Sequence, residues 1–417
     1  MITIVNIGEL AGIVPAGVTV LKGPEMASVG VLHDAWLQIE DGRIVNFGTG
    51  EAPCAGEVID ARGGLVMPAF CDSHTHLVYA GSREGEFLDK LAGLSYEEIA
   101  ARGGGILNSA DLLHETSEDS LFEQSMVRVR EVLRAGTAAL EIKSGYGLRL
   151  EDELKMLRVI RRIKAAVPAL VKATFLGAHA VGRGFTHAQY VDEVLKMIPA
   201  AAELADFIDV FCDEGFFTPK DTARILEEGV RYSLRPKIHA NELAVSGGVQ
   251  VGVKFGALSV DHLERTTDAE ISALKGSWAC CSESRGGSGC CGTIPVMLPG
   301  SSFFLGLPYG RARAFVDAGL PLALASDYNP GSSPSGDMRF VMALGCIKMR
   351  LTPSEALAAV TLNGAAALGL SDVTGSVTRG KRADLILTHP GWSLTRLAYN
   401  YTTPFIREVF VGGEPLL

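Results

Sequence analysis

Short runs rich in apolar and β-branched residues recur along the middle of this chain, with helix-like stretches between them. The runs occupy residues 64–71, 137–142, 172–177, 207–212, 235–238, 258–260, 293–298 and 321–325. Helical periodicity appears at 120–134, 151–167, 190–204, 219–228 and 268–274. Repeated alternation of strand and helix predicts an α/β fold, with parallel strands closed into a (β/α)8 TIM-type barrel. A doubly wound open sheet is the alternative, but it would not naturally gather residues from the first, fifth and eighth strands around one point.

Both flanks of the chain have a different pattern. Residues 1–62 contain short alternating runs at 2–7, 18–21, 35–39 and 43–47, broken by Gly and Pro, and residues 371–417 contain runs at 383–387 and 406–411. Such runs are typical of antiparallel strands. We therefore predict that 1–62 and 371–417 pair into one small β-sandwich beside a barrel of residues 63–370. A helix at 353–368 would link the two.

Composition and charge exclude several classes of function. Of the 417 residues, 47% are hydrophobic and 21% charged, which is ordinary for a soluble globular protein. The net charge of −10 argues against a surface that follows nucleic-acid phosphates. Neither a signal-peptide pattern nor an apolar run of about 18 residues is present. We expect a cytoplasmic protein with no nucleic-acid or membrane partner.

The eight cysteines fall into two groups. Four are scattered and are expected to be reduced, buried thiols: Cys54, Cys71, Cys212 and Cys346. The other four crowd into the Gly/Ser-rich segment 278–292, at positions 280, 281, 290 and 291. We expect this segment to be an exposed insertion at the bottom of the barrel, without a catalytic role. A redox-sensitive or metal-binding staple is the alternative.

Metal-ligand side chains follow three of the predicted barrel strands. His74 and His76 come after the first run, His239 after the fifth and Asp327 after the eighth. A His-x-His pair at a strand end directs both imidazoles to one side, because strand side chains alternate with a period of two. Three neutral nitrogens and one carboxylate can hold one zinc or ferrous ion and leave room for a water molecule. The sequence therefore predicts a metal-dependent hydrolase with its site at the C-terminal ends of the strands.

Further polar candidates fall on the same rim. His262 ends the sixth run and would be either a fifth ligand or a hydrogen-bond donor to a developing oxyanion. Glu242 would hold the attacking water or carry its proton; alternatively it would orient a ligand histidine. Tyr146 and His179 follow the second and third runs. Asp327 would both bind the metal and accept a proton.

Two loops look suited to an anionic substrate. Arg83 lies just beyond the metal pair, and arginine is the side chain best suited to bind a carboxylate through two hydrogen bonds. A solvated surface arginine is the plainer alternative. The segment Asn-Pro-Gly-Ser-Ser-Pro at 329–334 has Gly and Ser N–H groups that would form an anion-receiving nest, although these residue types also simply favour loops.

Four segments carry a resemblance to a known family. They are Asp-Ser-His-Thr-His-Leu-Val-Tyr-Ala-Gly-Ser-Arg from residue 72, Glu-Ile-Lys-Ser-Gly-Tyr-Gly-Leu from 141, Thr-Phe-Leu-Gly-Ala-His-Ala from 174 and Ser-Asp-Tyr-Asn-Pro-Gly-Ser-Ser-Pro from 326. The chain resembles the imidazolonepropionase family of the amidohydrolase superfamily over nearly its whole length. The second and fourth segments resemble that family specifically, whereas the segment ending at Leu385 resembles the superfamily in general.

This resemblance implies hydrolysis of the cyclic amide 4-imidazolone-5-propanoate to N-formimidoyl-L-glutamate, the third step of histidine degradation. One zinc or iron ion per chain would be bound by His74, His76, His239 and Asp327. Substrate would be contacted by Arg83, Tyr146, His179, Glu242, Asn329, Gly331 and Ser332. His262 would lie near the reacting carbonyl, with Glu242 or Asp327 passing a proton to the departing nitrogen.

Two other functions remain open from the sequence. A purine or pyrimidine deaminase would use the same metal ligands, but it would not need an arginine for a carboxylate tail. A non-catalytic barrel module would be expected to show gaps in the ligand set. A homodimer is expected only by analogy with the superfamily.

Overall fold

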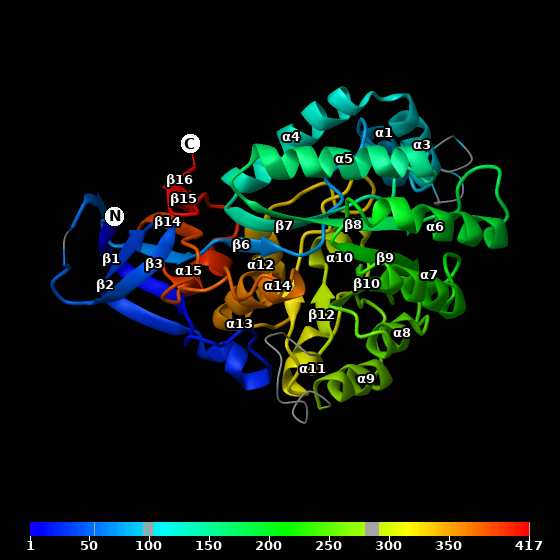
Figure 1. Cartoon of the computed structure of the whole chain (residues 1–417). Helices are drawn as coiled ribbons and strands as arrows, with labels where there is room; N and C mark the ends of the chain where they lie inside the picture. Colours follow the sequence, from blue (N-terminus) through cyan, green and yellow to red (C-terminus); the bar gives the residue numbers. More distant parts are fainter. Residues whose placement is uncertain (54, 95–97, 99–101, 103, 280–291, 417) are drawn as a thin grey trace.

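Two sheets organise the chain in the computed structural model, which describes residues 1–53, 55–94, 98, 102, 104–279 and 292–416. One sheet collects strands from both ends of the chain, and the other is built from the middle. In Figure 1 the terminal sheet lies on the left, with both chain ends, and the helices surround the second sheet on the right. The expected division into a barrel and a small β domain made from both termini is confirmed.

The second sheet is an eight-stranded parallel barrel with its strands in sequence order. Its strands are β6 (Phe70–Asp72), β7 (Thr137–Lys143), β8 (Leu170–Ala178), β9 (Phe207–Cys212), β10 (Arg235–Ala240), β11 (Ser259–His262), β12 (Ile294–Met297) and β13 (Ala323–Leu324). Just beyond β6 and β13 the chain forms a parallel bridge between Thr75 and Tyr328, which joins the first strand to the last. Asp327 N donates to His74 O at 3.0 Å beside this bridge. Barrel closure therefore holds two predicted metal ligands together.

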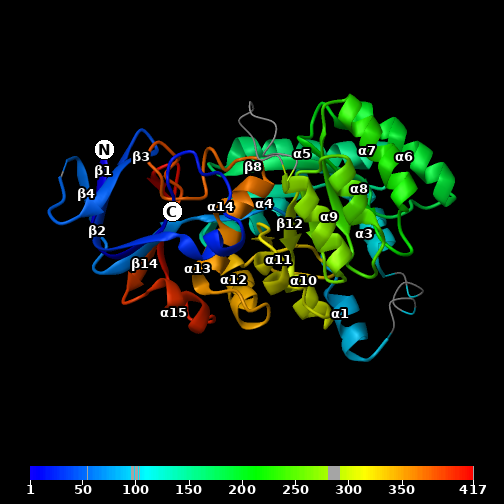
Figure 2. The same ribbon diagram turned by 90° about the horizontal axis from the view of Figure 1, so that it is seen from below.

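Helices cover the outside of the barrel (Figures 1 and 2). They are α3 (Ile106–Glu115), α4 (Glu118–Arg134), α5 (Leu150–Ala166), α6 (His187–Ala201), α7 (Pro219–Arg231), α8 (Gly248–Lys254), α9 (Asp268–Ala279), α10 (Pro299–Leu305), α11 (Ala312–Asp317) and α12 (Met338–Ile347). Capping boxes fix the start of α6 at Thr186 and of α7 at Thr218. Among the described residues, no helix is both long and apolar enough to span a bilayer.

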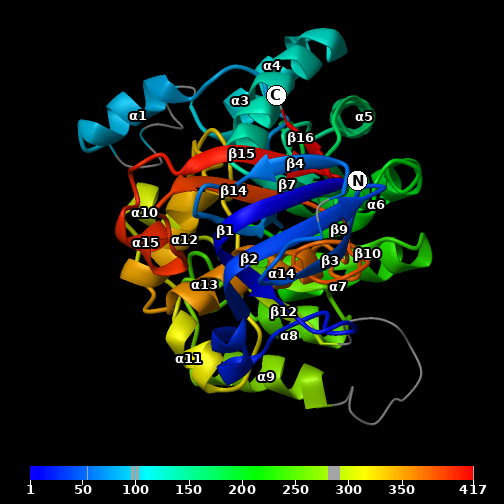
Figure 3. The same cartoon turned by 90° about the vertical axis from the view of Figure 1, so that its left-hand side faces the viewer.

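The terminal sheet has the order β16-β15-β14-β5-β1-β2-β3, with β4 paired to β1. Its strands are β1 (Ile2–Ile13), β2 (Gly30–Glu40), β3 (Arg43–Thr49), β4 (Glu57–Asp60), β5 (Gly64–Pro68), β14 (Leu385–Pro390), β15 (Ile406–Val411) and β16 (Glu414–Pro415). Figure 3 shows this sheet in front of the barrel. Side chains from strands along the sheet share one apolar cluster, which includes Ile4, Leu37, Val66, Leu385 and Phe410.

Three elements differ from the sequence prediction. The run at 64–71 is two strands, because β5 pairs with β14 in the terminal sheet and only β6 belongs to the barrel. Residues 18–21, expected as a strand, are not in one. The helix expected at 353–368 is interrupted at Thr361, whose φ of −125° and ψ of −90° leave the helical region. β5 belongs by pairing to the terminal sheet, although it lies inside the range 63–370 predicted for the barrel. The boundaries 1–62, 63–370 and 371–417 stay predictions.

The interrupted helix consists of α13 (Pro353–Val360) and α14 (Leu362–Ala367), and α14 packs directly on the barrel. A Cβ added at Gly364 would overlap the carbonyl oxygen of Cys71 in β6.

We expect Gly364→Ala to lower the free energy of unfolding by about 1–3 kcal/mol, because the buried backbone contact leaves no room for a methyl group. Urea denaturation would measure the change. Gly276→Ala in α9 is the matched control; that site has open space, so the variant should be neutral or more stable.

Candidate active site

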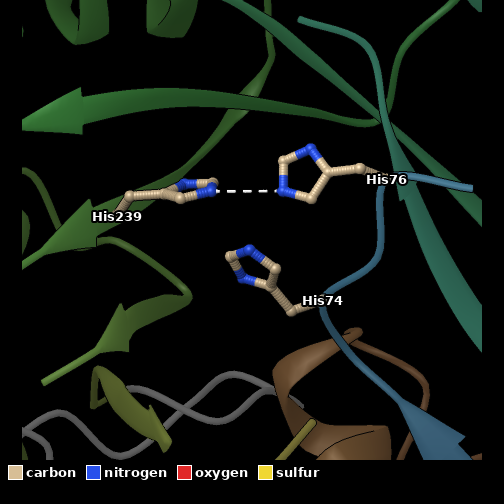
Figure 4. A group of neighbouring side chains, drawn as sticks. All are labelled: His74, His76 and His239. Atoms are coloured by element: carbon tan, nitrogen blue, oxygen red, sulfur yellow. Dashed lines mark hydrogen bonds between the residues drawn. The ribbon is translucent and has the colours of Figure 1, made fainter. Parts of the chain in front are cut away.

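Three histidines and one aspartate converge at the C-terminal end of the barrel. Nε2 of His76 lies 3.4 Å from Nε2 of His239 and 3.5 Å from Oδ1 of Asp327. Nε2 of His74 lies 3.6 Å from the same Asp327 oxygen. All four side chains are buried. Figure 4 shows the three imidazoles turned toward a common point.

These separations fit a bound metal ion. Ligand atoms at tetrahedral corners, each about 2.0–2.1 Å from zinc, lie about 3.3–3.4 Å apart. The separation of His76 and His239 matches that value, and the two separations that involve Asp327 exceed it by at most a few tenths of an ångström. Nε2 of His74 is also buried without a hydrogen-bond partner in the part of the chain that the structure describes. A buried lone pair with no donor is what a ligand atom requires.

Two carboxylates that sequence reasoning missed orient the ligand histidines. Asp261 Oδ2 lies 2.6 Å from Nδ1 of His74, and Asp209 Oδ2 lies 2.8 Å from Nδ1 of His239. Asp261 accepts a hydrogen bond from Nδ1 of His74, and the contact of Asp209 with Nδ1 of His239 favours a proton on that nitrogen, which leaves both Nε2 atoms as electron-pair donors. An acidic residue inside an otherwise apolar strand, as in the run Phe-Ile-Asp-Val-Phe at 207–211, is the sequence signal that would have indicated Asp209.

His76 has aromatic neighbours. His179 stacks on it with a centroid distance of 5.2 Å and an interplanar angle of 20°. Nδ1 of His179 lies 3.1 Å from the carbonyl oxygen of Gly145, so this nitrogen carries the proton and Nε2 is left as an acceptor. Burial lowers the pKa of His179 to about 4, which keeps the ring neutral. Tyr146 lies edge-on to both rings, at 6.0 Å from His76 and 5.5 Å from His179.

His262 lies between the metal cluster and a pair of acids. Its Nε2 is 3.7 Å from Glu242, and its Nδ1 is 3.5 Å from Glu264. Burial opposes protonation of His262, but Glu242 and Glu264 outweigh it and raise the pKa of His262 well above its usual value. Burial raises the pKa of Glu242 to about 7. These charges favour His262 as a hydrogen-bond donor, but one ring nitrogen of His262 also lies within 4.8 Å of ligand atoms of His74 and Asp327, so the donor role and the role of a fifth ligand both stay predictions.

Two residues of this rim have a strained backbone. His262 and Asp327 have φ angles of +83° and +55°, in the left-handed region that non-glycine residues rarely adopt. Holding them there costs about 1–3 kcal/mol each, which the surrounding packing must offset. The gain is that both side chains point toward the histidine cluster.

Arg83 reaches the rim from the loop after β6. Its Nε donates to Oε2 of Glu86 at 2.9 Å, and Oε1 of Glu86 accepts from Gly105 N. A Cβ added at Gly331 would overlap Nη1 of Arg83, so the guanidinium lies directly against the loop after β13. Burial raises the pKa of Tyr146, and the positive charge of Arg83 opposes that rise. The predicted substrate residues Arg83, Gly331 and Tyr146 thus share one side of the site.

The loop at 329–334 is organised by its own asparagine. The N–H groups of Gly331 and Ser332 both donate to Oδ1 of Asn329 at 2.8 Å. The hypothesis that these two groups form an anion-receiving nest is therefore wrong, because a side chain of the same loop occupies them. Nδ2 of Asn329 donates to Oγ of Ser332, whose hydroxyl lies 3.3 Å from Oδ2 of Asp327. Substrate contact by Asn329, Gly331 and Ser332 stays a prediction.

None of the three cysteines that the structure describes is among the site residues. Cys71 and Cys212 are buried free thiols, as predicted, and Cys346 is partly exposed. Cys54 and residues 280–291 lie outside the described residues, so the interpretation of the Cys-rich segment stays a prediction. The residues that flank this segment are held together, since Nε1 of Trp278 donates to the carbonyl oxygen of Thr293 at 3.0 Å.

Solved structures share the fold at low sequence identity. Atrazine chlorohydrolase TrzN from Arthrobacter aurescens TC1, complexed with zinc, superposes with a TM-score of 0.69 at 17% identity, covering 100% of this chain and 95% of that one. Guanine deaminase from C. acetobutylicum, with bound guanine, gives a TM-score of 0.67 at 16% identity, covering 98% and 99%. At such identities these likenesses establish the architecture and leave the substrate open.

Sequence comparison is more specific. The amidohydrolase family model matches residues 258–416. Imidazolonepropionase of Flavobacterium johnsoniae is 49% identical over 423 residues, covering 99% of this chain and 100% of the relative. Imidazolonepropionase of Geobacillus kaustophilus is 40% identical over 404 residues, covering 94% and 92%. The resemblance predicted from the four segments is confirmed, and this chain belongs to the imidazolonepropionase family of the amidohydrolases.

Proposed function

We propose that this protein hydrolyses 4-imidazolone-5-propanoate to N-formimidoyl-L-glutamate, the third step of histidine degradation. The observation that carries the proposal is full-length identity of up to 49% to imidazolonepropionases, together with the converging His74, His76, His239 and Asp327. The deaminase alternative has only distant structural likeness behind it.

The ligand set would hold one divalent ion, zinc or iron. When bound there, the ion supplies Lewis acidity and a lowered water pKa of about 7. Asp327 or Glu242 would accept a proton and return it to the departing ring nitrogen. Burial raises the pKa of Asp327 to about 6, and a divalent ion bound to its carboxylate would oppose that rise.

The remaining residues position the substrate. His262, protonated between its acid neighbours, would donate a hydrogen bond to the oxygen of the ring carbonyl as negative charge develops on it. Arg83 would bind the propionate carboxylate, with Tyr146 beside it, and neutral His179 would accept a hydrogen bond from the ring through Nε2. Fixing the tail in this way places the ring carbonyl against the histidine cluster. The homodimer, the cytoplasmic location and the absence of a nucleic-acid partner stay predictions.

Turnover of alternative substrates tests the proposal. Purified protein would be given 4-imidazolone-5-propanoate, guanine or cytosine, and the ultraviolet absorbance of each ring followed with time. We expect absorbance loss with the imidazolone only, and formation of N-formimidoyl-L-glutamate confirmed by mass. Deamination of guanine or cytosine at a comparable kcat/KM would instead support the alternative.

Removal of the metal is expected to abolish turnover without unfolding the protein. His239 lies on β10, and the other three ligands lie just beyond β6 and β13. The packing of these strands does not depend on the ligands, so chelation should leave the circular dichroism spectrum unchanged. Stoichiometric Zn²⁺ or Fe²⁺ added back should restore activity, and the ion giving the higher kcat identifies the working metal. Full activity at less than about 0.1 ion per chain would contradict the metal assignment.

A further inference from the structure

Five charged side chains fill the barrel interior beneath the ligand histidines. This interior ion cluster consists of Glu141 and Lys143 on β7, Asp209 on β9, Lys237 on β10 and Asp261 on β11. All five are 0–1% exposed. Burying charges in a barrel core is costly unless each is paired and hydrogen-bonded. Apolar side chains would fill the same space at less cost, so the cluster calls for a functional reason.

Lys143 is the connecting member of the cluster. Its Nζ donates to Oε1 of Glu141 at 2.7 Å and to Oδ2 of Asp209 at 2.8 Å. The same Nζ lies 3.9 Å from Oδ2 of Asp261. Lys237 has a different role, because its Nζ donates to Glu141 and to the carbonyl oxygen of Ser73 and approaches only Asp261, at 3.7 Å. Among the described residues, Lys143 alone has an ammonium within 4 Å of both Asp209 and Asp261.

Those two aspartates are the partners of the ligand histidines. Asp209 Oδ2, the atom that Lys143 binds, lies 2.8 Å from Nδ1 of His239. Asp261 Oδ2 lies 2.6 Å from Nδ1 of His74. The Lys143 ammonium therefore contacts the carboxylate partners of two of the three imidazoles. It donates a hydrogen bond to Asp209 and lies 3.9 Å from Asp261. Among the described residues, the only carboxylate within 4 Å of His76, the third imidazole, is that of Asp327, which lies at Nε2 rather than at Nδ1.

We propose that Lys143 is a positioning residue for the metal centre, holding Asp209, and through it His239, in the orientation that binds the ion. The inference rests on the proposed metal-dependent function. Without the Lys143 ammonium, the Asp209 carboxylate would lose the hydrogen bond at 2.8 Å that fixes its orientation. Nδ1 of His239 would then lose its fixed partner, and Nε2 would become a poorer and less well-directed ligand. Removing Lys143 should thus weaken metal binding from a distance.

Cobalt titration of the chelator-treated protein tests this role without relying on turnover. Co²⁺ accepts the same nitrogen and oxygen ligands and reports their geometry in its visible absorption. We expect Lys143→Met to bind Co²⁺ about 10–100-fold more weakly than wild type, with an altered band shape. Lys155→Met is the matched control. That largely buried ammonium binds the carbonyl oxygens of Leu113 and Thr116 away from the site, so its Co²⁺ affinity should be unchanged.

A second pair of variants separates positioning from loss of folding. Lys143→Met combined with Asp209→Asn removes one charge of each sign and keeps the net charge of the cluster. If Lys143 acts through Asp209, adding Lys143→Met to Asp209→Asn should change Co²⁺ affinity by less than about threefold. A further 10-fold loss in that background would overturn the proposed route.

The outcomes separate this inference from the proposed function. Unchanged Co²⁺ affinity and band shape in Lys143→Met, with wild type binding one ion, overturn the inference and leave the proposed function standing. Wild-type protein that binds no Co²⁺ overturns both. Should Lys143→Met fail to fold, the charge-balanced double variant compared with Asp209→Asn alone still decides the question.

Discussion

Asp327→Asn is expected to lower kcat/KM by about 10³-fold or more while leaving the fold intact. Oδ1 of Asp327 lies 3.5–3.6 Å from ring nitrogens of His76 and His74, at one corner of the ligand set. Asparagine keeps the size of the side chain, but it carries no negative charge and cannot accept the proton. Loss of a positioned proton acceptor alone costs about 10²–10⁴-fold, and weaker metal binding adds to that. Steady-state kinetics and metal content per chain measure both effects.

Asp206→Asn is the matched control for this variant. Asp206 precedes β9, at the opposite end of the barrel, where it binds Lys172 and the N–H of Ala173. The same chemical change there should leave kcat/KM within about twofold and metal content unchanged. If Asp327→Asn retained more than a tenth of wild-type kcat/KM with one ion bound, Asp327 would be neither an essential ligand nor the proton acceptor.

The barrel could be predicted from the sequence because its strands are buried on both faces and read as apolar runs. That same property explains the main error of the fold prediction. Residues 64–71 form one unbroken apolar run, yet Gly64–Pro68 pairs with β14 and Phe70–Asp72 with β7. Pro68, which lacks an N–H for a ladder, is the only local mark of the change of sheet. Which sheet accepts a buried strand is decided by partners hundreds of residues away.

The ligand residues could be predicted because a parallel barrel brings all strand ends to one rim. Residues that act inside the strands could not be identified in this way. Asp209 and Asp261 carry no motif, and their contacts with His239 and His74 exist only once the barrel closes. The nest hypothesis failed for a related reason: nothing in the sequence of the 329–334 loop shows that Asn329 accepts the N–H groups of Gly331 and Ser332.

Arg83→Ala is expected to lower kcat/KM for 4-imidazolone-5-propanoate by about 10²–10³-fold, mainly through a higher KM, with metal content unchanged. Truncating one partner of a buried, hydrogen-bonded charge pair costs about 2–5 kcal/mol, and each 1.4 kcal/mol is tenfold. The guanidinium is largely buried, with 15% of its side chain exposed, and is held by Glu86 beside Gly331. Arg83→Lys should lose most of the same activity, because a lysine ammonium cannot reproduce the two parallel hydrogen bonds that a guanidinium donates to a carboxylate.

A substrate whose propionate is replaced by its neutral amide makes the Arg83 test specific. If Arg83 binds the carboxylate, wild type and Arg83→Ala should hydrolyse the amide at kcat/KM values within about threefold of each other, since the lost contact is absent from both. Arg183→Ala is the matched control for net charge: that arginine is 54% exposed and paired with Asp111, so its loss should change kcat/KM less than about threefold. An equal penalty for Arg83→Ala on the acid and the amide would place Arg83 outside the carboxylate site, as a residue that shapes the loop at Gly331.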